Sequence, residues 1–198
     1  MGLPTVSMVW LDKIHLKSGQ GAKSEEALVA TLRRELRAGL KAQGVEPDYL
    51  DRCVYIIRMH GDFIIGYPNG SSPVLYIGRG DAFGRLSTHL KRWLHQVEKF
   101  GNDVGIEIRV CRPRRRNVTD MFKHVEADLI ARFAGRYGSI PFFNSRPETA
   151  YEDCVDYTEG DEQALRAAIG TGSGNRPKWV IAPAPSNPNY DVYYKGQQ

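Results

Sequence analysis

Glu126 is the residue whose surroundings in this sequence most strongly suggest chemistry. Phe122 and Ile130 are each four residues from it and Leu129 is three residues away, so a helix over 118–138 would place all four on one face. A carboxylate among core residues is costly unless it is paired or bound to a metal. Two interpretations therefore stand: an ion pair with an arginine, or an oxygen ligand for Mg²⁺ or Mn²⁺.

A basic stripe on the segment 82–100 is the second candidate. Arg85 and His89 are four residues apart, so on a helix their side chains are neighbours, and Arg92 and Lys99 follow on the same side. The opposite stripe is apolar and contains Leu86, Leu90, Trp93, Leu94 and Val97. This pattern fits a helix that faces a phosphate backbone, but taken alone it more often marks a solvated helix face.

Two tyrosines lie within short apolar runs that predict strands. Tyr55 is in CVYIIR (53–58) and Tyr76 is in VLYIG (74–78), which continues into Arg79 and Gly80. If the two strands pair, both hydroxyls reach one rim of the sheet. The alternative is that both tyrosines only pack there, because tyrosine favours strands.

The remaining elements predict an α+β fold in the order strand, strand, helix, strand, helix. The strands are expected at 53–58, 74–78 and 105–110, and the helices at 82–100 and 118–138. A helix over 24–44 is expected, with Ser24 at its start and Gly44 at its end. Its leucines recur every fourth residue, so this face packs on the core or on a second copy, and the core is favoured. Further expectations are a strand at 5–11, a loop at 59–73 with FII (63–65) as a possible extra strand, a helix at 161–170, a strand near 177–183 and a loose tail at 182–198. We divide the chain into an N-terminal extension (1–50), a core (51–148) and a partly flexible C-terminal extension (149–198).

Composition restricts the class of protein. The chain has 198 residues, 41% apolar and 25% charged, with a net charge of +4, which permits a nucleic-acid partner without requiring one. Three widely spaced cysteines form no CxxC pair, so neither a zinc site nor a disulfide framework is expected, and we predict a cytoplasmic protein. No apolar run is long enough for a membrane span. The densest cationic run, RPRRR (112–116), is expected to be a solvated loop.

Several common catalytic motifs are absent from the sequence. Gly78, Gly80 and Gly84 follow a strand and open a helix, but their spacing is one residue too long for a dinucleotide-binding turn. The sequence contains no P-loop GK[ST], no HExxH and no GxSxG.

The order of these elements resembles the GIY-YIG nuclease superfamily. VYI (54–56) stands for the family's first tripeptide, from which it departs at the first residue (Cys53-Val54 here), and YIG (76–78) stands for the second. Arg85 and His89, then Glu126 within HVEADLIARF, then Asn144 after PFF complete the set. The resemblance covers about residues 53–146. It implies a small mixed or antiparallel three-stranded sheet flanked by helices.

The resemblance also implies roles for individual residues. Tyr55 and Tyr76 would position or deprotonate the attacking water, and which of them is the base stays open. Arg79 and Arg85 would act near the scissile phosphate, His89 would lie beside them, and Glu126 would hold one Mg²⁺ or Mn²⁺ ion. Asn144 would support the site by hydrogen bonding. Nucleic-acid contacts are expected from Arg92, Lys99, Arg112, Arg114, Arg115 and Arg116.

The sequence therefore predicts a metal-dependent endonuclease that hydrolyses phosphodiester bonds in DNA, with RNA as an open alternative substrate. A different class is kept beside it: an inactive scaffold that binds nucleic acid or a protein partner. A homodimer through the 24–44 helix is a further alternative, and no membrane partner is expected.

Overall fold

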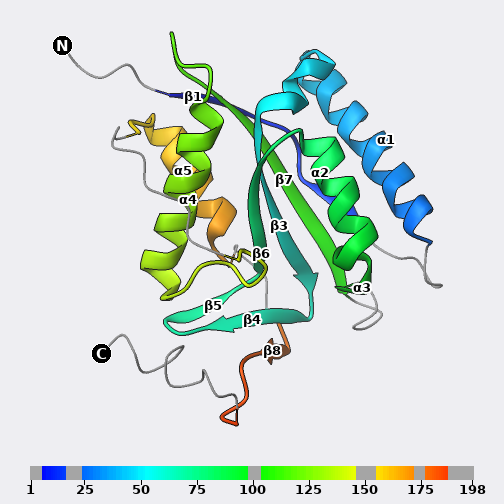
Figure 1. The fold of residues 1–198 in the computed structure, drawn as a ribbon, viewed down its shortest axis with the longest axis vertical. Coiled ribbons are helices and arrows are strands. Elements are labelled where there is room, and N and C mark those ends of the chain that lie inside the picture. The colour runs from blue at the N-terminus through cyan, green and yellow to red at the C-terminus, as the bar shows by residue number, and fades with distance from the viewer. Residues whose placement is uncertain (1–5, 17–23, 98–103, 146–154, 172–176, 187–198) are drawn as a thin grey trace.

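The structure is a computed structural model that describes residues 6–16, 24–97, 104–145, 155–171 and 177–186. A central antiparallel sheet lies between two layers of helices (Figure 1). The helices α1 (Glu25–Gln43) and α2 (Ala82–His89) cover one face, and α4 (Met121–Tyr137) and α5 (Glu159–Ile169) cover the other. This arrangement confirms the α+β class.

The central sheet has five strands, so the prediction of three strands was wrong. The predicted strands are β3 (Cys53–Gly61), β6 (Val74–Gly80) and β7 (Val104–Arg114), in the spatial order β7, β3, β6. Two N-terminal strands, β1 (Ser7–Trp10) and β2 (Ile14–Leu16), both pair antiparallel with β7. They cover an edge of β7 that would otherwise present unpaired backbone groups.

A smaller three-stranded sheet occupies most of the segment predicted as a loop at 59–73. β4 (Phe63–Tyr67) and β5 (Gly70–Ser72) form an antiparallel hairpin, and β8 (Trp179–Ile181) pairs parallel with β4. The possible strand at 63–65 lies within β4, but the loop prediction for the rest of the segment was wrong, because the turn residues at 68–69 belong to a hairpin that gains a third strand from the far end of the chain. Residues 187–198 of the predicted tail lie outside the described residues.

α1 matches the helix predicted from the leucine repeat. The Ser24 hydroxyl accepts a hydrogen bond from Ala27 N at 3.3 Å, and Gly44 ends the helix with φ = 60°. Leu28, Leu32, Leu36 and Leu40 are all buried, and the helix packs against β2 and α2. The leucine face is thus part of this chain's own core.

The predicted helix at 82–100 is continuous but not uniform. α2 leads into a π-helical turn, η2 (Leu90–Leu94), and then into α3 (His95–Val97); residues 98–103, including Lys99, lie outside the described residues.

A 3₁₀ helix, η1 (Pro47–Arg52), precedes β3. Among the described residues, no helix is both long and apolar enough to cross a bilayer.

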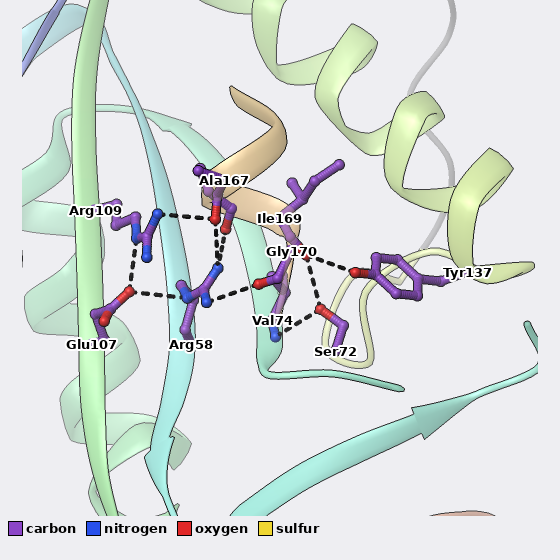
Figure 2. Close-up of polar contacts among 10 residues, drawn as sticks. Arg58, Ser72, Val74, Glu107, Arg109, Tyr137, Ala167, Ile169 and Gly170 are labelled. Carbon is purple, nitrogen blue, oxygen red and sulfur yellow. Dashed lines mark hydrogen bonds and ion pairs between the residues drawn. The ribbon is translucent and has the colours of Figure 1, made fainter. Parts of the chain in front are cut away.

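Two arginines of the central sheet, Arg58 on β3 and Arg109 on β7, bond the C-terminal end of α5 (Figure 2). Arg58, only 3% exposed, donates to the carbonyls of Ala168 and Gly170, and Arg109 donates to the carbonyl of Ala167 at 3.0 Å. Both arginines bond one carboxylate oxygen of Glu107, at 3.0 and 2.7 Å. The last carbonyls of a helix need donors and carry partial negative charge, so this cationic pair caps α5.

The run RPRRR is not a free loop, because Arg112–Arg114 form the end of β7. Arg112 lies opposite Val9 of β1, and its guanidinium is 3.4 Å from the carboxylate of Asp48. The run of charged residues gave no strand signal, because the strand β1 with which it pairs lies about 100 residues away in the sequence. Arg114 and Arg116 remain exposed.

Candidate active site

Tyr55 and Tyr76 lie on the same face of the central sheet. Tyr55 is opposite Gly78 in the β3–β6 register and Tyr76 is opposite Ile57, and the two rings stack with centroids 6.1 Å apart. A Cβ atom at Gly78 would lie 2.5 Å from the ring of Tyr76 and 2.6 Å from the hydroxyl of Tyr55. Glycine is therefore required at this position for the two rings to approach each other.

His89 extends from α2 toward these rings and is held on both sides. Trp93 Nε1 donates to His89 Nδ1 at 3.1 Å, and His89 Nε2 is 3.2 Å from the hydroxyl of Tyr55. Burial, followed by the charges of Arg85 and Arg92, lowers the pKa of His89 to about 4. The imidazole is therefore neutral at pH 7. Because the indole N–H is only a donor, the proton is on Nε2, which donates to Tyr55.

Tyr55 is the inner of the two tyrosines. It is 1% exposed, and burial raises its pKa well above the ordinary value, with Tyr76 acting in the same direction and Arg85 opposing it. Tyr55 therefore stays protonated. Tyr76 is only half-buried, so it is the tyrosine that reaches the solvent side of the pair.

Glu126 of α4 is buried, with a side chain 6% exposed, as its place in the apolar stripe predicted. One of its carboxylate oxygens is 2.6 Å from Nη1 of Arg79, whose side chain is 26% exposed. Arg79 belongs to β6, the outermost strand of the central sheet on this side. The ion-pair interpretation of Glu126 is therefore realised in this structure.

Asn144 binds the free edge of β6. Its Oδ1 accepts from Ile77 N at 3.0 Å and its Nδ2 donates to Ile77 O at 2.8 Å. The side-chain amide thus occupies both backbone groups of Ile77 as a neighbouring strand would. This contact fixes the 141–145 segment beside the YIG strand.

These residues surround one cleft of about 460 Å³. Tyr76 and His89 come from one face of the sheet, while Glu126 comes from the helix layer on the other face and meets them at the β6 edge. The lining comprises Tyr76, Arg79, Arg85, Thr88, His89, Arg92, Trp93, Glu126, Phe143, Asn144 and Ser145. Tyr55 is not in the lining and lies one hydrogen bond behind it, on His89.

The sequence reasoning missed Trp93 and Phe143 as site residues. Trp93 was assigned to the apolar stripe, although its place four residues after His89 puts the two rings side by side on a helix. Phe143 stacks on Trp93 with ring centroids 4.0 Å apart. No short-range pattern predicts this second contact.

The predicted basic residues form a separate group. Arg112, Arg114 and Arg115 line a second hollow of about 360 Å³ together with Arg52. This group lies at the same end of the sheet as Arg79, since Val54 of β3 is opposite both Arg79 and Cys111. Arg116 is exposed next to it, whereas Arg92 lines the cleft itself.

Two places among the described residues offer metal ligands: Glu126 alone, and the group of His15, His60 and Glu107. Glu126 offers one hard carboxylate in a polar cleft with room for a hydrated cation and a phosphate, which fits Mg²⁺ or Mn²⁺. His15, His60 and Glu107 bring three ligand atoms within 4.8 Å of one another. Arg58 and Arg109 already bond Glu107, so a cation at this second set would face two positive charges.

Comparisons of this chain with protein-family models, with curated proteins and with solved structures give no match.

Proposed function

We propose that this chain is a divalent-metal-dependent endonuclease of the GIY-YIG type, acting on phosphodiester bonds in DNA. One observation carries the proposal: Tyr76, Arg85, His89 and Glu126, from separate segments of the chain, line a single cleft. Such a cleft combines a hydroxyl, a cation and a carboxylate, which are the groups that phosphodiester hydrolysis uses.

Arg85 and Arg92 are the groups suited to bind the phosphate. Both are exposed at the surface of the α2–η2 segment and both line the cleft, so their guanidinium groups are accessible to an anion. A guanidinium binds two phosphate oxygens at once and stabilises the extra charge of the transition state. Burial, followed by the charges of Arg85 and Arg92, lowers the pKa of His89 and keeps it neutral.

The hydrogen bonds in the cleft have a direction that ends at Tyr76. Trp93 donates to His89, His89 donates to Tyr55, and the protonated Tyr55 hydroxyl is hydrogen-bonded to Tyr76. Tyr76 is half-buried and lines the cleft, whereas Tyr55 is buried behind it. We therefore assign Tyr76 as the group that takes the proton from the attacking water and Tyr55 as a positioning residue.

Glu126 is the residue that would hold the metal ion. A bound Mg²⁺ or Mn²⁺ supplies Lewis acidity and neutralises charge on the phosphate. Arg79 occupies one carboxylate oxygen of Glu126 and keeps the carboxylate aimed at the cleft rim. Arg79 thereby orients the ligand and adds positive charge near the phosphate.

The proposal is tested by incubating supercoiled plasmid and a structured RNA with the protein, with and without Mn²⁺. We expect nicking of DNA that requires the metal. Glu126→Gln keeps the side-chain shape but removes the charge, and Arg85→Ala removes the phosphate contact; each should lower the rate by about 100-fold or more. Lys91→Ala, an exposed cation one residue before Arg92, should cleave like the wild type.

Unchanged cleavage by purified, folded Glu126→Gln would remove the metal role from this residue. The binding-only alternative has one observation in its favour, namely that Arg79 already pairs Glu126. Salt-sensitive DNA binding with no nicking across metals and substrates would favour that alternative.

A further inference from the structure

A second hollow with a different lining lies next to the cleft. This apolar hollow has a volume of about 480 Å³, and its wall includes Ile65, Ile140, Phe142, Ile181 and Pro183. Asn144 lines both the cleft and the apolar hollow. A strongly cationic surface therefore meets a strongly apolar one at a single residue.

A row of aromatic rings crosses this boundary. Trp93 and Phe143 stack with centroids 4.0 Å apart and planes 25° from parallel, and Phe142 meets Phe143 edge to face at 4.8 Å. Phe142 is 56% exposed and Phe143 is 38% exposed. Together with the apolar hollow beside them, these rings form a contiguous apolar surface rimmed by the polar cleft, which is a feature of ligand-binding grooves.

The backbone of these exposed rings is held in place. Phe143 N donates to the carbonyl of Leu75 on β6 at 2.9 Å, and Phe142 N donates to the hydroxyl of Tyr67 at 3.0 Å. The side chain of Asn144 adds its two bonds to Ile77. The rings are thus presented by a segment bonded to the sheet, and a ligand that binds them does not have to order that segment first.

The neighbouring charges identify the ligand that fits. Arg85 and Arg92 select an anion in the cleft, while the ring of Phe142 and the apolar side chain of Ile140 in the neighbouring hollow select an apolar group. A nucleotide has both parts, a phosphate and a base whose two faces stack on aromatic rings. Inside a paired duplex the base faces are already stacked, so only an unpaired or extruded nucleotide offers them.

We propose that the apolar hollow beside Phe142 binds an unpaired nucleobase next to the phosphate held in the cleft. The substrate class is then nucleic acid with an unpaired nucleotide at the cleavage position, such as a single strand, a flap or a bulge. This inference rests on the proposed nuclease function, because it uses the cleft as the phosphate site.

Binding without divalent metal tests the inference separately from cleavage. Fluorescence anisotropy compares a single strand, a fully paired duplex, the same duplex with one bulged nucleotide, and that bulged duplex with the unpaired base removed. We expect the bulged duplex to bind at least about 10-fold more tightly than the paired duplex. Loss of the unpaired base should abolish the preference, because base stacking on an aromatic ring contributes about 5- to 150-fold in affinity.

Phe142→Ala should remove the preference for the bulged duplex and leave affinity for the paired duplex unchanged, whereas Phe142→Trp should retain the preference. Trp179→Ala is the matched control, since Trp179 is an exposed aromatic residue (61%) outside the lining of the apolar hollow. It should bind all four DNAs like the wild type.

Equal binding of paired and bulged duplexes by the wild type would overturn the inference, and so would equal weakening of all four DNAs by Phe142→Ala. A dimer that Phe142→Ala dissociates would overturn it too, because a second copy would then fill the hollow. A plasmid and oligonucleotide cleavage assay with Mn²⁺ separates the two proposals. Equal cleavage of paired and bulged DNA would contradict this inference and leave the nuclease proposal standing. Selective binding of the bulged duplex without any cleavage would contradict only the nuclease proposal.

Discussion

The side chain of Asn144 bonds both backbone groups of Ile77, with Oδ1 3.0 Å from the Ile77 nitrogen and Nδ2 2.8 Å from the Ile77 oxygen. An amide matches this donor–acceptor pair, and a carboxylate does not, because it has no proton to donate to the carbonyl. The contact joins the segment that carries Phe142 and Phe143 to the strand that carries Tyr76.

Asn144→Asp should lower the free energy of unfolding by about 1–3 kcal/mol at pH 7, because the carboxylate faces the carbonyl of Ile77. The measurement is urea unfolding followed by circular dichroism. The deficit relative to the wild type should shrink below about pH 4, where the introduced carboxyl group is protonated and can donate to the carbonyl. A deficit that does not depend on pH would show that the carbonyl contact is not the cause.

Gly78→Ala should disrupt the candidate active site, because the new methyl would lie 2.5–2.6 Å from Tyr76 and Tyr55. We expect the free energy of unfolding to fall by about 1–3 kcal/mol from overpacking and displaced rings. Gly135→Ala is the matched control, since this glycine lies in α4 with open space around the position of a Cβ. It should stabilise the protein by about 0.5–1 kcal/mol. Thermal unfolding of both variants measures the two effects. Equal stabilities of the two variants would contradict the close approach of the two tyrosine rings to Gly78.

Glu107→Gln should be among the most destabilising charge substitutions in the chain. Glu107 is 7% exposed and is bonded by both Arg58 and Arg109, and Arg58 is itself buried (Figure 2). Burial, with Arg109 acting in the same direction, lowers the pKa of Arg58 to about 10, so it stays charged at pH 7. Removing the carboxylate leaves that charge uncompensated, which costs about 3–5 kcal/mol.

The control for this substitution is Glu35→Gln. Glu35 pairs with Arg34 at 3.0 Å, but both side chains are largely exposed, so the change should cost less than about 0.5 kcal/mol. Urea unfolding of both variants gives the two values. Similar losses for Glu107→Gln and Glu35→Gln would mean that the buried ion pair does not hold α5 in place.

His89 should make stability fall with decreasing pH. Its pKa is about 4 in the folded chain, below the ordinary value near 6.5, because of burial, Arg85 and Arg92. Between pH 6.5 and pH 4 the unfolded chain binds a proton that the folded chain does not, so the stabilisation present above pH 6.5 is lost through this window.

The comparison between the wild type and His89→Gln isolates this effect, because all other titrating groups are shared. From pH 7 to pH 4.5 the wild type should lose about 1–2 kcal/mol more than the variant, after allowing for the partial exposure of the ring. Chemical unfolding across this range measures the difference. Parallel pH profiles would contradict a buried neutral imidazole.

Local patterns were enough to predict the elements that carry the candidate site. Three such patterns are the leucine repeat of α1, the alternation in β7 and the apolar stripe that includes Glu126. Each depends on side chains a few residues apart, so each can be recognised in the sequence. The strand predicted at 5–11 matches β1, but the local patterns predicted neither β2 nor the pairing of both strands with β7, because that pairing spans about 100 residues.

The order of the tyrosines, arginine, histidine, glutamate and asparagine, and the helix faces that carry them, can be read from the amino-acid sequence alone. The pairing of Arg79 with Glu126, the bonding of Asn144 to the edge of β6, and the exposure of Phe142 and Phe143 beside the cleft depend on the fold. Periodicity is a property of neighbours on one element, whereas these contacts join residues that meet only when separate elements pack against the same edge strand.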